Sequence, residues 1–119
     1  MKFEATPFTQ NRRGMLANAE ILFPSATNYR VGPVAEYDER QAVSVDAADP
    51  EEALALTYLR YQNVDDDHHT PDGGASIMKL DLIRLDDGEN VTWWTCCNFG
   101  WHQVEAPGET EFVMAPEDA

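Results

Sequence analysis

Residues 76–104, SIMKLDLIRLDDGENVTWWTCCNFGWHQV, constrain the fold of this chain more than any other stretch. Met78, Leu80 and Leu82 alternate with polar residues, which is the two-residue period of a half-buried strand. An Asp-Asp-Gly turn follows, in which Gly88 can take a positive φ. This part of the chain therefore predicts the first strand and the turn of a β-hairpin.

The second half of the same stretch is expected to complete the hairpin and to add a third strand. Residues 91–97 are β-branched and aromatic, and residues 101–104 follow after a break at Asn-Phe-Gly. All three tryptophans and both cysteines of the chain lie in this half. We therefore expect Phe99 and Trp101 to be largely buried around Gly100.

The clearest single element is a helix over about residues 50–62. Asp49 can accept a hydrogen bond from the first turn, and Pro50 suits the first helical position. The helical spacing of the apolar residues predicts which face packs on the sheet. That face consists of Leu54, Ala55, Tyr58, Leu59 and Gln62.

The rest of the chain is expected to complete a single domain over residues 1–119. Residues 41–46 alternate like a further strand, and residues 2–5 suit a short edge strand that Pro7 limits. The fold class is then α+β, with an antiparallel sheet of four or five strands and one main helix, residues 50–62, on one face.

The two ends of the chain carry weaker signals. Residues 1–28 are poorly determined by their pattern: residues 11–14 suit a turn, and residues 15–23 suit either helix or strand. Residues 106–119 form an acidic C-terminal tail that we expect to be partly frayed, with a short strand over residues 111–114.

The charge of the chain is its most unusual property. Twenty-two acidic residues against eight basic ones give a formal net charge of −14. Direct binding to nucleic acid is disfavoured, because lysines and arginines are needed to displace counterions from phosphates. A basic protein partner suits this surface, as does a halophile-like role in which the acids only keep the protein soluble.

The acids gather in three groups along the sequence. These groups are Asp65, Asp66, Asp67 and Asp72; Asp86, Asp87 and Glu89; and Glu36, Asp38 and Glu39. Two groups that converge would make a continuous negative face, and this face would steer a basic partner. Exposed charges contribute little alone, so tight binding also needs an aromatic anchor, for which Trp93 and Trp94 are the candidates.

Candidate metal ligands are limited to the acidic loop, where His68 and His69 follow three aspartates. The spacing fits neither a calcium loop nor a zinc site, so these histidines are weak candidates and we expect no metal and no cofactor.

The thiol–imidazole pairing open to this chain is Cys96 or Cys97 with His102. Neighbouring cysteines in a strand point to opposite faces and cannot easily form a disulfide. An aromatic and acidic neighbourhood raises thiol pKa values, which disfavours nucleophilic attack. The residues therefore favour a protein that is not an enzyme.

The N-terminal residues contain no apolar signal-peptide core, and no apolar run approaches the length of a membrane span. We expect a cytoplasmic protein with no membrane partner. The sequence leaves the oligomeric state open.

The chain resembles small YodL-like domains, which are encoded by phages, plasmids and conjugative elements. The resemblance covers roughly residues 28–105 and includes a helix that opens with DPEEAL and a closing W-x-C-x-x-F-G-W. The matching residues are Ser76, Ile77, Asp81, Leu82, Ile83, Gly88, Phe99, Gly100 and Trp101. Residues 78–80 depart from the pattern, which usually has a small residue, valine and glycine there. The resemblance implies a mobile-element setting and an accessory role, with no established reaction.

Together, the residues and the resemblance predict a non-catalytic acidic protein of a phage or mobile element. Its partner would be a basic surface of a host protein such as a defence component, for example a surface that binds nucleic acid. The alternatives are a small enzyme that uses its Cys/His or Asp/His groups, and a halophile-adapted domain.

Overall fold

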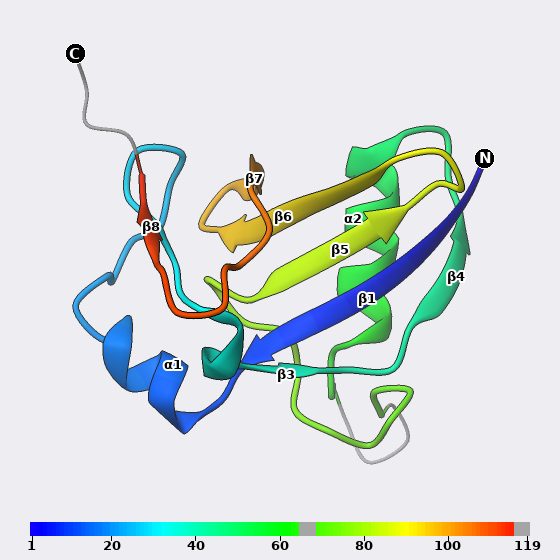
Figure 1. Ribbon diagram of the computed structural model, residues 1–119. Coiled ribbons are helices and arrows are strands. Elements are labelled where there is room, and N and C mark those ends of the chain that lie inside the picture. The colour runs from blue at the N-terminus through cyan, green and yellow to red at the C-terminus, as the bar shows by residue number, and fades with distance from the viewer. Residues whose placement is uncertain (65–68, 116–119) are drawn as a thin grey trace.

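The computed structural model describes residues 1–64 and 69–115, and its fold is α+β as predicted (Figure 1). Its main sheet is antiparallel and six-stranded, in the order β3-β1-β5-β6-β7, with β4 also paired to β1. The strands are β1 (Lys2–Gln10), β3 (Tyr37–Glu39), β4 (Val43–Asp46), β5 (Leu82–Asp86), β6 (Val91–Cys97) and β7 (Gly100–Val104). The helix α2 (Pro50–Arg60) packs against β1 and β4.

Strand β1 lies inside the sheet, so the prediction of a short edge strand over residues 2–5 was wrong. It pairs with β5 on one side, and with β4 and then β3 on the other. The Pro7 carbonyl accepts a hydrogen bond from the Arg40 N–H at 2.8 Å. In a strand, the N and O of one residue point the same way, so the missing N–H of Pro7 faces the gap between β3 and β4. A proline there removes no hydrogen bond of the β1–β5 ladder.

The start of α2 confirms the predicted cap, because the Asp49 carboxylate accepts a hydrogen bond from the Glu52 N–H at 2.8 Å. The predicted buried face was wrong by about one residue. The buried side chains are Ala53, Leu54 and Thr57, followed by Tyr61 just after the helix, whereas Ala55, Tyr58 and Leu59 are exposed.

Two hydrogen bonds explain how α2 can bury polar side chains. The Thr57 hydroxyl donates to the Ala53 carbonyl at 2.7 Å, and the Tyr61 hydroxyl donates to the Gln41 carbonyl. Because both hydroxyls have partners, their burial leaves no unsatisfied group. The apolar spacing alone does not reveal these partners.

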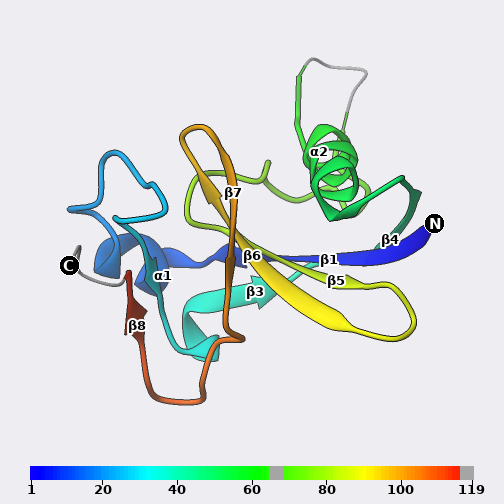
Figure 2. The same cartoon turned by 90° about the horizontal axis from the view of Figure 1, so that it is seen from above.

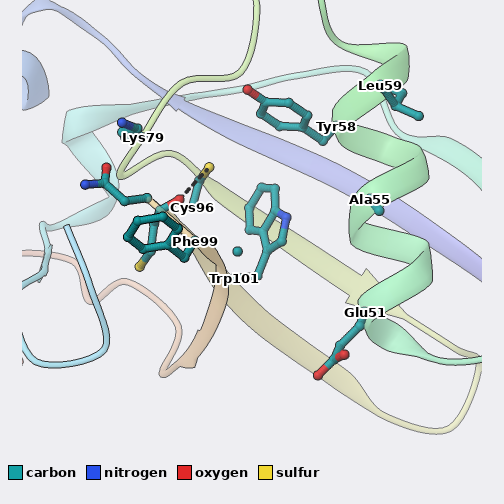
Figure 3. A pocket seen from close by; sticks show the side chains of 11 residues that line it. Glu51, Ala55, Tyr58, Leu59, Lys79, Cys96, Phe99 and Trp101 are labelled. Carbon is teal, nitrogen blue, oxygen red and sulfur yellow. Dashed lines mark hydrogen bonds between the residues drawn. The ribbon is translucent and has the colours of Figure 1, made fainter. Parts of the chain in front are cut away.

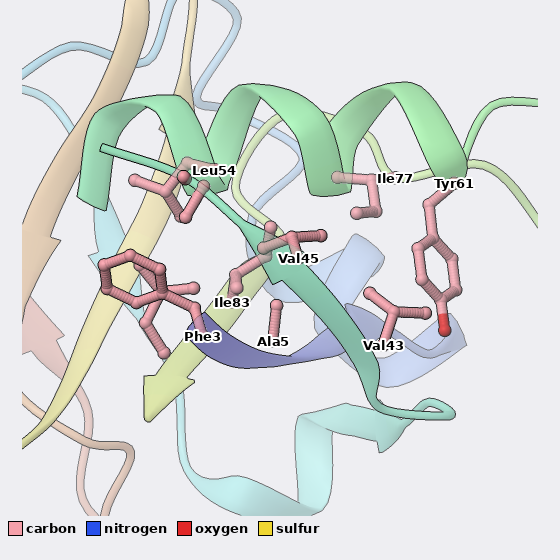
Figure 4. Packing of buried hydrophobic residues seen from close by; sticks show 11 residues of the cluster. Phe3, Ala5, Val43, Val45, Leu54, Tyr61, Ile77 and Ile83 are labelled. Carbon is pink, nitrogen blue, oxygen red and sulfur yellow. The ribbon is translucent and has the colours of Figure 1, made fainter. Parts of the chain in front are cut away.

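Each face of the sheet has its own core. Between α2 and the sheet lies a cluster that includes Phe3, Ala5, Val43, Val45, Leu54, Tyr61, Ile77 and Ile83, with Trp94 and Trp101 packed at its margin (Figure 4). The opposite face carries a second cluster of Phe8, Tyr29, Val31, Tyr37, Leu80 and Leu82, with Trp93 and Val104 beside it.

Strand β5 begins at Leu82, so the predicted strand over residues 78–82 was wrong in its first part. Met78 is exposed, and Leu80 is buried with φ at +70°. Asp81 explains this geometry, because its carboxylate accepts a hydrogen bond from the Met78 N–H at 2.8 Å and so closes a tight turn. The Leu80 N–H donates to the Cys96 carbonyl at 2.8 Å, which holds the turn on β6.

The residues between β1 and β3 and residues 105–115 form a small second unit beside the main sheet. Helix α1 (Arg12–Ala17) is capped by the Asn11 side chain, so residues 11–14, predicted as a turn, are its cap and first turn. The short strand β2 (Arg30–Val31) is followed by the 3-10 helix η1 (Val34–Glu36) and pairs with β8 (Val113–Met114). Strand β8 falls within the predicted 111–114 strand. Residues 116–119, the end of the tail expected to fray, lie outside the described residues.

A buried chain of polar side chains ties this unit to the sheet. Asp81 accepts hydrogen bonds from the Gln10 N–H at 2.8 Å and the Gln10 side chain at 3.0 Å. The Gln10 side chain accepts from Asn18 at 2.9 Å, and Asn18 accepts from Arg30 at 3.1 Å. Arg30 then pairs with Glu36 through two contacts of 2.7 and 3.1 Å.

Candidate binding groove

The first acidic group is only partly described. Asp65, Asp66, Asp67 and His68 lie outside the described residues, and His69 is exposed. Asp72 forms two short hydrogen bonds to the Arg40 guanidinium, at 2.6 and 2.7 Å, and this arginine holds the pKa of Asp72 well below its usual range. The charge of Asp72 is therefore compensated within the protein.

The other two groups lie at opposite ends of β1. Asp86, at the β5–β6 turn, is paired with Glu4 near the start of β1, while Glu39 in β3 is paired with Phe8. Four residues of extended strand separate these points by about 13 Å. The structure therefore does not bring the β5–β6 turn and β3 into one acidic face.

The remaining acids of these groups have different surroundings. Glu36 is buried in its ion pair with Arg30, whereas Asp38 and Glu39 are exposed on β3. Glu89 is exposed, and the Asp87 carboxylate accepts turn N–H bonds that lower its pKa. Asp86 and Asp87 are thus half-buried acids that hold the β5–β6 turn, and Glu89 is the exposed acid of this group.

The two predicted aromatic anchors face opposite sides of the sheet. Trp93 packs on the Phe8 ring, with 4.8 Å between centroids, and Trp94 packs on the cluster under α2. The Trp94 indole N–H also donates to the Thr92 hydroxyl at 2.9 Å. Both tryptophans are half-buried, so each is largely used in packing.

An open apolar groove of about 680 Å³ lies between α2 and the β6–β7 turn (Figure 3). Figure 2 shows α2 and this turn on the same side of the sheet. The apolar lining comes from Ala55, Tyr58 and Leu59 of α2, and from Cys96, Phe99 and Trp101 of the turn and its strands. The α2 side chains are those that the sequence wrongly assigned to the core.

Phe99 is completely exposed, at 102%, so the prediction that it is buried was wrong. Asn98 and Phe99 form a two-residue turn, and Gly100 follows with φ at +118°, a region that favours glycine. The Asn98 N–H donates to the Pro24 carbonyl at 3.0 Å, which fixes the turn against the N-terminal segment. Phe99 is therefore held out from a fixed turn.

Trp101 lines the groove and is half-buried, so the prediction that it is largely buried was only partly right. Its ring meets Tyr58 edge-on, with 6.3 Å between centroids. The charged residues that line the groove are Glu51 and Lys79, which lie at opposite ends in Figure 3. The groove thus offers aromatic and aliphatic surface between an acid and a lysine.

The thiols beside the groove are poor nucleophiles. Burial raises the pKa of Cys96 to about 12, and burial also raises the pKa of Cys97. Both cysteines are free thiols, and His102 packs its ring on Tyr29 on the other side of the sheet. Within residues 1–64 and 69–115, no three His, Cys, Asp or Glu side chains are grouped so that they could hold a metal ion.

The sequence carried one signal for this groove. Besides its buried side chains, α2 has apolar Leu56, Tyr58 and Leu59 on its exposed sides. A helix that is apolar beyond a single stripe has more apolar surface than one core can cover. Phe99 gave no comparable signal, because a phenylalanine between two core strands is most simply read as buried.

No helix in the described part of the chain is long and apolar enough to cross a bilayer. No family model, curated protein or solved structure matches the chain. The groove and the charge are therefore the features of this chain that bear on its function.

Proposed function

We propose that this protein is a non-catalytic binding module that uses the groove between α2 and the β6–β7 turn to hold a basic segment of another protein. The observation that carries the proposal is Phe99, an aromatic side chain that is fully exposed on a fixed turn beside an apolar groove. Large aromatic side chains at interfaces commonly provide most of the binding energy.

The charge supports a basic partner. A net charge of −14 attracts a basic segment at long range and speeds its association, and it repels acidic competitors. The exposed acids outside the groove then act in steering, while the groove provides the contact. The sequence predicted one acidic face with Trp93 or Trp94 as its anchor. In the present proposal, long-range attraction and direct contact belong to different surfaces.

The setting that we propose is a phage or mobile element, with a host protein such as a defence component as the partner. Its support is the resemblance to YodL-like domains. At Leu80, where that pattern usually has glycine, the backbone takes the left-handed φ of +70° that glycine prefers. Leu80 thus differs from the glycine of the pattern, but its backbone has the conformation that a glycine would adopt there.

Affinity capture from host lysate tests the proposal, with wild-type protein, Phe99→Ala and Phe112→Ala compared in parallel. Phe112 is also exposed, at 58%, but it lies over Arg30 and outside the groove. We expect a basic protein to be captured by wild type and Phe112→Ala, and to be lost with Phe99→Ala. Capture should weaken between about 50 and about 300 mM salt, because salt screens exposed charges. Capture that is equal for all three proteins and insensitive to salt would contradict the proposal.

A further inference from the structure

Strand β7 forms one edge of the main sheet, and no strand in residues 1–64 and 69–115 pairs with its outer side. We propose that the basic segment binds as an added antiparallel strand on β7, with alternate side chains over the groove. This inference rests on the proposed function and adds how the partner is held.

The hydrogen bonds of β6 establish which backbone groups of β7 point outward. Cys96 exchanges backbone hydrogen bonds with the turn before β5, since its carbonyl accepts from Leu80 and its N–H donates to Asp81. Directions alternate along a strand, so Thr95 and Cys97 face β7 and bond to His102 and Gly100. The residues between and beyond these, Trp101 and Gln103, therefore point their N–H and C=O groups away from the sheet.

The same alternation places the groove beside this edge. Trp101 packs on the α2 side of the sheet, and Val104 packs on the opposite side. Trp101 therefore points its backbone N–H away from the sheet and also lines the groove with its ring. An antiparallel strand paired with Trp101 points alternate side chains to the same face, toward Tyr58 and Leu59.

The edge of β7 also lacks the usual protection against pairing. Its sequence, GWHQV, contains no lysine, acid or proline, which are the residues that commonly keep exposed edges apart. The opposite edge of the sheet carries Asp38 and Glu39 in β3 and Asp46 in β4. The unprotected edge is therefore the one beside the groove.

Charge decides between a basic partner and a second copy of this chain. Two copies joined through β7 would bring together two bodies of charge −14, and Glu105, exposed directly after β7, would lie at the junction. A segment with lysines or arginines is instead attracted by Glu105 at the end of β7 and by the net charge of −14. Main-chain hydrogen bonds would provide affinity, and the groove would select apolar side chains at alternate positions.

The test uses a fluorescent hexapeptide of alternating valine and lysine, with blocked ends, and measures binding by anisotropy at low salt. Two further peptides carry backbone N-methyl groups on the valines or on the lysines. In an antiparallel added strand, the residues over the groove are those whose N–H groups face β7. We expect valine methylation to abolish binding and lysine methylation to leave it within a few-fold of the parent peptide.

Variants of β7 provide the matched protein controls. Gln103→Pro removes an outward N–H without taking a bond from the β6–β7 ladder, and Gln103→Ala leaves that N–H in place. Peptide affinity should fall tenfold or more with Gln103→Pro and stay near wild type with Gln103→Ala, while thermal melting confirms that both variants fold.

The outcomes separate this inference from the proposed function. No binding of the unmodified peptide, or equal binding of both methylated peptides, overturns strand addition. A different outcome is binding that is sensitive to salt and lost with Phe99→Ala, yet unchanged by methylation and by Gln103→Pro. That outcome would support the basic partner and contradict the added strand. Equal binding of a valine–glutamate peptide contradicts the basic partner instead. A dimer that sedimentation detects, that the peptide dissociates and that Gln103→Pro abolishes would make a second copy the occupant and overturn the proposal.

Discussion

Among single residues, Asp81 joins the end of β1 to the turn before β5 through hydrogen bonds. Its carboxylate, fully buried at 0% exposure, receives hydrogen bonds from both the backbone and the side chain of Gln10 and from the Met78 N–H. Burial nevertheless dominates and raises the pKa of Asp81 from 3.8 to about 6. The folded protein therefore binds a proton here more readily than the unfolded chain.

This difference predicts a pH dependence of stability. Because the folded pKa lies above the unfolded one, the stabilisation is present below about pH 4 and is lost as the pH rises through about 6. Between pH 4.5 and 7 this group should reduce the free energy of unfolding by about 2 kcal/mol. Asp81→Asn cannot titrate, so denaturant titrations at the two pH values should differ less for this variant than for wild type. Parallel pH profiles would contradict the assignment.

The Arg30–Glu36 pair gives a second prediction at this scale. Both side chains are largely buried, and removal of one leaves the other charge without its partner. We expect Glu36→Ala to lower the free energy of unfolding by about 3–5 kcal/mol. The matched control is Glu39→Ala, which removes an exposed acid of the same acidic group and should change stability by no more than about 0.5 kcal/mol. Similar effects of the two changes in urea titration would contradict the buried pair.

Among the elements, α2 has a start that the sequence specifies directly. Asp49→Ala should cost about 0.5–2 kcal/mol, because it removes the acceptor for the Glu52 N–H. Asp49→Asn keeps an acceptor and is expected to stay close to wild type. The prediction fails if the alanine variant unfolds at the same denaturant concentration as the asparagine variant.

The β6–β7 turn predicts a contrast between two aromatic residues. Phe99 has no covered surface to lose, so Phe99→Ala should change the free energy of unfolding by no more than about 0.5 kcal/mol. Trp101 is half-buried against the cluster under α2, so Trp101→Ala should cost roughly 1.5–3 kcal/mol. Denaturant titration measures both. A large loss with Phe99→Ala would mean that its ring is packed in the fold and is not held free for a partner.

Local chemistry made some of these elements predictable. The Asp49 cap, the turn at Gly88 and strand β6 each depend on residues close in sequence, and the structure confirms them. Strand β1 depends on distant partners: Pro7 is tolerated only because β3 and β4 meet end to end beside it. The residues around Pro7 do not indicate that β3 and β4 leave this gap between them.

The sequence indicated surplus apolar surface on α2, but it could not indicate which side of the helix is buried. Which side of α2 is buried depends on Thr57 and Tyr61 finding acceptors, one of them Gln41 in the segment before β4. Once those residues are buried, Tyr58 and Leu59 turn outward and become groove lining. The spacing of apolar residues takes no account of such hydrogen bonds. It therefore assigned the apolar residues of the groove to the core.

For the whole molecule, the distribution of charge does not mark a single binding surface. The acids of the β5–β6 turn and of β3 lie at opposite ends of β1, so charge alone does not define a docking face. The apolar groove is the surface that we propose for docking.

Backbone chemical-shift mapping tests the groove most directly. In this measurement, ¹⁵N-labelled protein is titrated with the valine–lysine peptide at low salt. We expect the shifted amides to cluster at Tyr58 and Leu59 of α2, at Phe99 and along β7, and we expect Phe99→Ala to weaken these changes greatly. Shifts centred on Asp86–Glu89 or on β3, with the groove unchanged, would show that surface acids hold the basic segment and would contradict binding in the groove.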